Sequence, residues 1–115
     1  MAKSITKEFL SGSTNGRPIL VVATATPGTI IHTANLISRD EIYLWAHNRD
    51  MVSRLLTIEY GGVTSPGDIF DMAIPPNSGL EFIIPGLILS NGLIVRAFAA
   101  AANVINVCGY VERVS

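Results

Sequence analysis

The chain has 115 residues, of which 49% are hydrophobic and only 15% are charged, and its formal net charge is -1. This length suits one domain with one core, and the near-neutral charge argues against nucleic acid or anionic lipid as a partner. Soluble domains usually carry about 25% charged residues. The deficit therefore predicts either a membrane location or a surface that other subunits cover.

Neither a membrane span nor a secreted chain is indicated. The apolar stretch over residues 80–98 is interrupted by Pro85, Gly86 and Asn91, so it offers no unbroken run of about 20 apolar residues. The N-terminus lacks the apolar segment of a signal peptide, and the single cysteine, Cys108, excludes an internal disulfide. We expect synthesis in the cytoplasm.

The first 16 residues are mostly polar, with Ser, Thr and Gly toward their end. They predict an N-terminal arm or tail, which Phe9 and Leu10 interrupt with apolar side chains. One β-sandwich domain is expected over residues 17–115.

Short apolar and β-branched segments, separated by Gly and Pro turns, then predict strands throughout the chain. In residues 40–48, strict alternation places Tyr43 and Trp45 on one face and Ile42 and Leu44 on the other. We expect core packing for the two aromatic residues. The expected strands are 17–24, 28–34, 40–48, 54–60, 69–74, 80–84, 87–90, 93–98 and 102–114.

Asn91-Gly92 lies between two apolar runs and is a strong signal for a type I′ hairpin. It predicts that residues 87–90 and 93–98 pair, with Leu89 opposite Ile94. Both faces of this hairpin are apolar, so one face needs a second layer or another subunit. About eight strands in all predict an all-β fold, an antiparallel β-sandwich of the jelly-roll kind.

No motif for catalysis or metal binding stands out. His32 and His47 have no second histidine nearby, and one cysteine cannot supply a zinc ribbon. Cys108 lies in an apolar segment without a basic neighbour, which indicates a core residue rather than a nucleophile. We therefore expect no metal, no cofactor and no enzymatic activity. The carboxylates are explained as solvated side chains, and these are Glu59, Asp68, Asp71 and Glu81.

An alternative function is suggested by three aromatic residues, Tyr43, Trp45 and Tyr60. Together they could form a platform on which sugar rings stack. A carbohydrate-binding module is therefore a less favoured interpretation.

Four segments resemble small virion proteins of tailed bacteriophages: GTIIHTA, DEIYLWAHN, LLTIEYGG and IIPGLILSNGLIVRAFAAAANVINVCGYVERV. The resemblance spans residues 28–114. It implies a β-sandwich structural protein of the capsid decoration or cement type, located at the capsid surface. Another virion component, such as a head–tail connector, a tail subunit or a fibre-base subunit, is the alternative.

The resemblance also implies partners, namely the major capsid protein and two further copies of the chain in a homotrimer. For contact with the capsid shell we expect three residues of the arm and its end, Phe9, Leu10 and Arg17. For contact between subunits we expect apolar residues of the hairpin, which are Leu87, Leu89, Leu93 and Val95. No nucleic acid and no membrane partner is expected.

Overall fold

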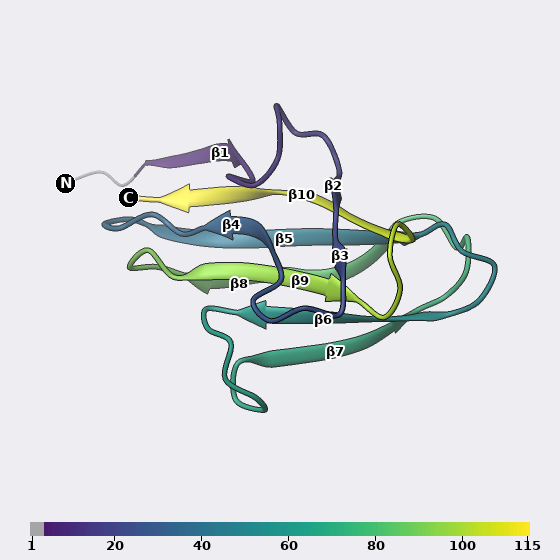
Figure 1. Cartoon of the computed structure of the whole chain (residues 1–115). Coiled ribbons are helices and arrows are strands. Elements are labelled where there is room, and N and C mark those ends of the chain that lie inside the picture. The colour runs from purple at the N-terminus through teal and green to yellow at the C-terminus, as the bar shows by residue number, and fades with distance from the viewer. Residues whose placement is uncertain (1–3) are drawn as a thin grey trace.

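The computed structural model describes residues 4–115, which form two facing β-sheets of five strands each (Figure 1). Sheet A has the order β1-β10-β5-β8, with β2 also beside β10, and sheet B has the order β3-β9-β6-β7, with β4 also beside β9. The expected all-β sandwich is confirmed, and this strand order is that of a jelly roll. The strands are β1 (Ile5–Phe9), β2 (Ile19–Leu20), β3 (Val22–Ala23), β4 (Thr29–Thr33), β5 (Arg39–Asn48), β6 (Arg54–Tyr60), β7 (Ile69–Ile74), β8 (Glu81–Leu89), β9 (Ile94–Ala99) and β10 (Ile105–Val114).

The core lies between the sheets and follows the two-residue period of the strands. In β5, Ile42 and Leu44 are fully buried, whereas Tyr43 and Trp45 are half-buried on the outer face of sheet A. The alternation was predicted correctly, but the expectation of core packing for the two aromatic residues was wrong. The aliphatic face is the one that meets sheet B, because it alone offers a continuous apolar surface.

The Asn-Gly turn forms, but the hairpin does not. Asn91 and Gly92 have φ angles of 60° and 72°, and the N–H of Leu93 donates to the carbonyl of Ser90 at 3.2 Å. However, β8 pairs with β5 in sheet A, while β9 pairs with β4 and β6 in sheet B. The turn therefore crosses between the sheets, so that both strands can bury one apolar face in the same core.

Strand β8 also joins two segments that were expected to be separate, because it continues through Pro85 and Gly86. An edge strand tolerates proline, since the missing N–H is not needed by a neighbour. Gly86 has a φ of 96°, and a Cβ there would lie 2.8 Å from a ring carbon of Tyr43. The absence of a side chain at this position is what lets the ring lie against the backbone.

The segment predicted as an N-terminal arm contributes a strand instead. β1 pairs antiparallel with β10, from Ile5 opposite Val114 to Phe9 opposite Tyr110, and Leu10 is 1% exposed in the core. The part of this segment that the structure describes, residues 4–16, thus belongs to the sandwich, and residues 1–3 lie outside the described residues.

The strand predicted over residues 17–24 is two short strands that lie in different sheets. β2 pairs with β10 and β3 pairs with β9, and Val21 between them is buried. This segment therefore crosses from sheet A to sheet B and closes one side of the sandwich (Figure 1). The last strand begins at Ile105, because a turn with Asn103 at a φ of 62° precedes it.

Candidate functional site

The carboxylate of Asp40 is fully buried and accepts hydrogen bonds from three parts of the fold. Arg113 donates from Nε to Oδ1 at 2.8 Å and from Nη2 to Oδ2 at 3.2 Å, and His32 Nε2 lies 2.7 Å from Oδ2. The backbone N–H of Asn35 adds a fourth bond. Burial by itself raises the pKa of Asp40, but the hydrogen bonds from Arg113 and His32 outweigh it and lower the pKa below its ordinary 3.8.

His32 is oriented for structure rather than for catalysis. Its Nδ1 accepts the backbone N–H of Ser11 at 3.0 Å, so Nε2 carries the proton and donates it to Asp40. The hydroxyl of Ser11 accepts the N–H of Thr33 at 2.7 Å. The imidazole is buried, so a substrate cannot reach it. This serine, histidine and aspartate instead tie the chain after β1 to β4 and β5.

On the outer face of sheet A, aromatic rings stack on one another across neighbouring strands. Trp45 stacks on Phe82 with centroids 4.8 Å apart, Tyr43 stacks on Tyr110 at 5.0 Å, and Trp45 and Tyr110 lie 6.0 Å apart. The Nζ of Lys7 lies 4.5 Å from the centroid of the Tyr110 ring. The ring of Trp45 is thus stacked against a ring on each neighbouring strand, whereas Phe82 itself is 55% exposed.

Tyr60 does not join this stack, although the sequence grouped it with Tyr43 and Trp45. It lies in sheet B, where its hydroxyl donates to the carbonyl of Leu87 at 2.9 Å, and burial raises its pKa. The three-residue sugar platform is therefore not assembled. Phe82 and Tyr110 were missed, because only the strand register places them opposite Trp45 and Tyr43.

The residues predicted for shell contact differ in exposure. Phe9 is 63% exposed and Arg17 is also exposed, so both are accessible to another chain. The expectation for Leu10 was wrong, because its side chain lies in the core. It falls one residue after β1, at the point where the chain turns inward toward β4.

The residues predicted for subunit contact do not share one surface. Val95 is fully buried and is therefore wrong as an exposed contact, while Leu89 is half-buried against the core. Leu93 is exposed near Gly61, and Leu87 is exposed between β7 and β8. They separate because β8 and β9 belong to different sheets.

Three loops meet at one end of the sandwich and expose apolar side chains there. The N–H of Ala34 donates to Leu93 O, and the N–H of Gly61 donates to Ile94 O, which joins the β4–β5, β6–β7 and β8–β9 loops. Leu36 and Ile37 project from the first loop, and Ile37 is 93% exposed.

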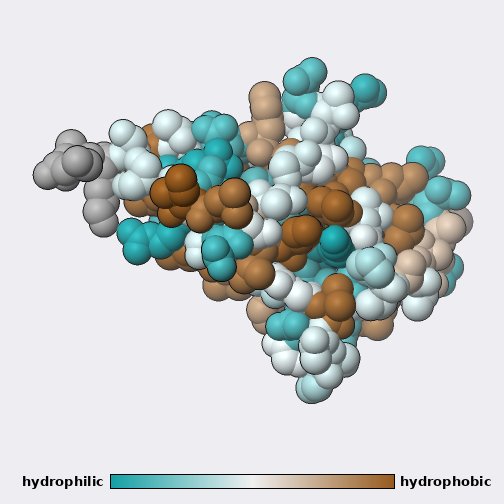
Figure 2. Space-filling view, turned by 60° about the vertical axis from the view of Figure 1, so that its left-hand side comes forward, coloured by the Kyte–Doolittle hydropathy of each residue, from teal (hydrophilic) through white to brown (hydrophobic). Residues whose placement is uncertain are grey.

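This loop end is held in a defined conformation. Asn35 Oδ1 accepts the N–H groups of Ile37 and Ser38 at 2.9 and 2.8 Å. Figure 2, in which this side of the molecule is turned forward, shows apolar residues gathered in patches between polar ones. This surface was not predicted from the sequence, although two adjacent large apolar residues in a polar segment were a signal for it.

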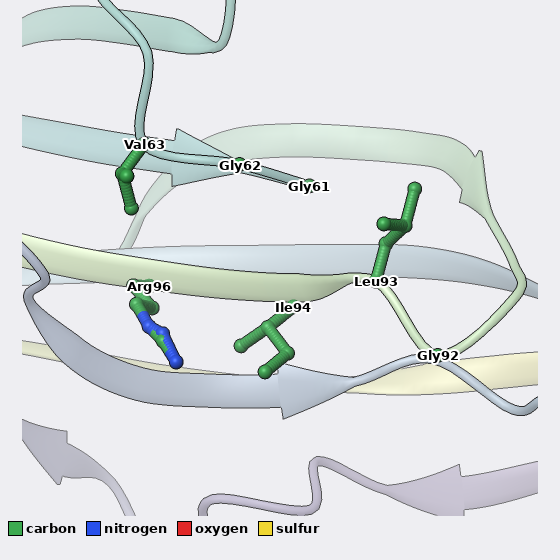
Figure 3. A pocket seen from close by; sticks show the side chains of 7 residues that line it. All are labelled: Gly61, Gly62, Val63, Gly92, Leu93, Ile94 and Arg96. Carbon is green, nitrogen blue, oxygen red and sulfur yellow. The ribbon is translucent and has the colours of Figure 1, made fainter.

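A cavity of about 240 Å³ lies beside the loop end (Figure 3). Leu93 points toward Gly61 and Gly62, whereas Ile94 and Arg96 point to the other side of their strand. Arg96 is the one charged residue in the lining, so the cavity holds no acid–base pair. The lining residues are Gly61, Gly62, Val63, Gly92, Leu93, Ile94 and Arg96.

Glu59 lies opposite Arg96 on β6 and is buried. Its Oε1 accepts the N–H of Gly28 at 2.7 Å, but its Oε2 and the Nε of Arg96 have no hydrogen-bond partner. No ion pair joins these two side chains among the described residues, and the expectation that Glu59 is solvated was wrong because β6 lies inside sheet B. This is the one place among the described residues where buried side-chain polar atoms are left unpaired.

Within residues 4–115, no three His, Cys, Asp or Glu side chains are grouped so that they could hold a metal ion. The expected core position of Cys108 was wrong, because this residue is half-buried opposite Trp45 on the outer face of sheet A, where burial still raises the pKa of its thiol. In the same described part of the chain, no helix is long and apolar enough to cross a membrane.

Comparisons with family models, with curated proteins and with solved structures found no match for this chain. The fold and the exposed surfaces therefore form the structural basis for assigning a function.

Proposed function

We propose that this protein is a non-enzymatic structural protein of a tailed-phage virion, which binds the outer capsid shell and stabilises it. The observation that carries the proposal is the amount of apolar surface on the sandwich: within residues 4–115, 17 large hydrophobic residues are exposed. With only 15% charged residues, such a surface is typical of proteins that other subunits cover.

The jelly-roll strand order supports this proposal without deciding it. Viral capsid proteins use the fold, but lectins and cupins use it as well. The stacked rings and the separate position of Tyr60 weaken the lectin-like alternative. The segments that resemble phage virion proteins favour the capsid role.

Shell stabilisation follows from linkage. A protein that binds the expanded shell, but not its precursor or its dissociated subunits, lowers the free energy of the expanded state by an amount that grows with affinity. In a homotrimer, three weak contacts with the major capsid protein act together through effective concentration. The loop end, with Leu36 and Ile37, is the surface that we assign to the shell.

Binding to shells tests the proposal. Purified protein is mixed with expanded and unexpanded shells of the phage that encodes it, and pellets are analysed for bound copies and for the temperature of shell disruption. We expect saturable binding of many copies to expanded shells and a higher disruption temperature. A few copies confined to one vertex would instead indicate the connector or tail alternative.

A matched pair of variants tests the assigned surface. Ile37→Asp places a charge at the loop end, and Met51→Asp places one at a similarly exposed site at the opposite end of the sandwich. We expect Ile37→Asp to lose shell binding while keeping the mass of the wild type, and Met51→Asp to bind normally. Normal binding by both variants would remove the loop end from the proposal.

A further inference from the structure

The two sides of the sandwich are closed to different degrees. On the side of β1, β2 and β3, the chain crosses between the sheets, and Leu10, Ile19 and Val21 are buried there. On the side of β7 and β8, no segment of residues 4–115 covers the gap. Phe70 and Leu87 remain 42% and 40% exposed, although they lie opposite the buried residues Ile58 and Ile42 in the strand register.

We call this open side the mouth. It contains a cavity of about 370 Å³ between the edge strands of the two sheets. Asp71 lies at its rim and is exposed, and within the described part of the chain it forms no ion pair, although its Oδ1 accepts a hydrogen bond from Thr57 at 2.9 Å. The mouth is thus an apolar slot with an acidic rim. Its lining residues are Ile69, Phe70, Asp71, Met72, Ile83, Ile84, Pro85 and Leu87.

The opposite edge of sheet A has the complementary character. β1 presents Ile5 and Phe9, which are among the exposed large hydrophobic residues. The ring of Phe9 lies against Gly16, since a Cβ built on Gly16 would be 3.2 Å from a carbon of that ring. Arg17 follows Gly16 in the sequence, so its backbone lies close to the ring of Phe9. Arg17 is exposed, and no ion pair involves it among the described residues. We call this edge the knob. It combines the exposed apolar side chains of Ile5 and Phe9 with the basic residue Arg17.

A chain cannot fill its own mouth with this knob. β10 and β5 lie between β1 and β8, and three steps of about 4.8 Å separate the two edges by about 14 Å. The knob and the mouth of one molecule therefore need another molecule. Because the two surfaces are different, their contact is head-to-tail, and such contacts form a closed ring when the rotation between copies permits it.

We propose that the mouth of each copy receives the β1 edge of the next copy, with Phe9 against Leu87 and Phe70, and with Arg17 facing Asp71. The ring has three members, and this number rests on the homotrimer of the proposed function, although the contact does not depend on shell binding. Side chains rather than a continuous strand ladder make the contact. Pro85 lacks an N–H for pairing in β8, and a lysine such as Lys7 on an edge strand opposes edge-to-edge pairing.

Cysteine cross-linking tests this contact in the free protein. In a Cys108→Ser background, Phe9→Cys is combined with Leu87→Cys and mild oxidation is followed on a non-reducing gel. A disulfide requires Cα atoms within about 7 Å, so this pair can join only two different chains. We expect covalent species up to three times 12.3 kDa from the double variant, and unlinked chains from each single variant.

The control combines Phe9→Cys with Leu55→Cys, because Leu55 is similarly exposed at 47% but lies on the outer face of sheet B. We expect no cross-link there. Dimers from Phe9→Cys alone would show a symmetric contact and overturn the proposal. An absence of cross-links in the Leu87 pair, or equal cross-linking in the Leu55 pair, would overturn it as well.

A charge exchange provides a second readout that does not need cysteines. Arg17→Glu and Asp71→Arg should each shift the mass measured by light scattering toward that of one chain, and the combined variant should restore the wild-type mass. Failure of the combined variant to restore it would contradict the pairing. If the cross-linked ring forms but does not bind shells, the proposed function is refuted and the subunit contact stands. If the protein binds shells but no ring forms, the subunit contact is refuted and the proposed function stands.

Discussion

At the scale of single residues, Asp40 shows how this fold accommodates a buried charge. Burial of an unpaired carboxylate is costly, and here Arg113 and His32 supply hydrogen bonds from β10 and β4. The guanidinium of Arg113 also lies 4.0 Å from Glu8. The network thus connects the N-terminal strand with the middle and the end of the chain.

Asp40→Asn removes the charge that this network is built around. Hydrogen bonds to charged groups are worth about 1.5–3 kcal/mol each, and we expect the variant to lose about 2–3 kcal/mol of unfolding free energy at neutral pH. Glu8→Gln is the control, because a partly exposed ion pair to the same arginine contributes less than about 1 kcal/mol. Urea unfolding measures both.

The pH dependence of this effect has a definite sign. The folded-state pKa of Asp40 lies below 3.8, so its contribution is complete above the unfolded-state pKa and is lost as the pH falls through the folded-state value. The difference between wild type and Asp40→Asn should therefore shrink in acid, below about pH 3.8. A difference that stays constant through the acid range would contradict the role of the charge.

Glycines test how tightly the outer face of sheet A is packed. Gly86→Ala brings a Cβ to 2.8 Å from the Tyr43 ring at a φ of 96°, and we expect a loss of about 2–4 kcal/mol. Gly79→Ala has a φ of 84° with open space, so it should cost about 1–2 kcal/mol from backbone strain alone. Gly67→Ala meets neither problem and should be neutral or slightly stabilising. Urea unfolding measures the three variants. Equal losses of unfolding free energy for Gly86→Ala and Gly79→Ala would mean that the contact with the Tyr43 ring is unimportant.

At the scale of elements, β1 is the strand that the sequence pattern did not predict. Its composition is polar apart from Ile5 and Phe9, both of which are exposed, and the residue that anchors it follows the strand. Leu10 packs in the core, and Ser11 bonds to His32. The strand is therefore held by the contacts of Leu10 and Ser11, which follow it directly, and by its pairing with β10.

Leu10→Ala distinguishes an integrated strand from a detached tail. Truncation of a buried leucine costs about 2–5 kcal/mol, and we expect a loss in this range. Thr6→Ala, at an exposed position in the same strand, should change stability by less than about 0.5 kcal/mol. If both variants unfold at the wild-type urea concentration, β1 does not contribute to the folded core.

The aromatic stack on β5, β8 and β10 makes a prediction about ligands. Trp45 is the single tryptophan, and its ring packs between Phe82 and Tyr110. We expect its fluorescence to be insensitive to added oligosaccharides, because the ring faces that sugars would cover are already occupied. Saturable quenching by one sugar would support the carbohydrate-binding interpretation. Phe82→Ala would then test whether uncovering one face of the Trp45 ring strengthens sugar binding.

At the scale of the whole molecule, two of the exposed apolar regions lie apart from each other. One is the loop end with Leu36 and Ile37, and the other comprises the two edges of sheet A, with Phe9 at one edge and Leu87 at the other. A single chain in water would leave both uncovered. This is the physical reason to expect an oligomer that covers the edges and leaves the loop end for a further partner.

The oligomer should be visible in both mass and stability. Light scattering should give a mass near three times 12.3 kDa, and the thermal midpoint should rise with protein concentration, because association stabilises the folded chain by mass action. Leu87→Asp should reduce the mass and abolish the concentration dependence. A wild-type mass of one chain at all concentrations would count against the homotrimer.

Local pattern was sufficient for the features that depend on neighbours along the chain. β6 and β7 were predicted with their observed bounds, and β5 to within one residue, because alternation of side chains is visible in a short window. The turn at Asn91-Gly92 was likewise correct, since positive φ at both positions is a property of those two residues. The all-β class follows from the same local signals.

Only the tertiary structure decided which strands pair and which residues share a surface. The separation of β8 from β9, the burial of Leu10 and Val95, and the stacking of Phe82 on Trp45 all depend on contacts between distant segments. The sequence determined that apolar faces exist and how they alternate. The packing of two sheets around one core determined which of those faces are buried and which, at the mouth and the loop end, are left for another chain.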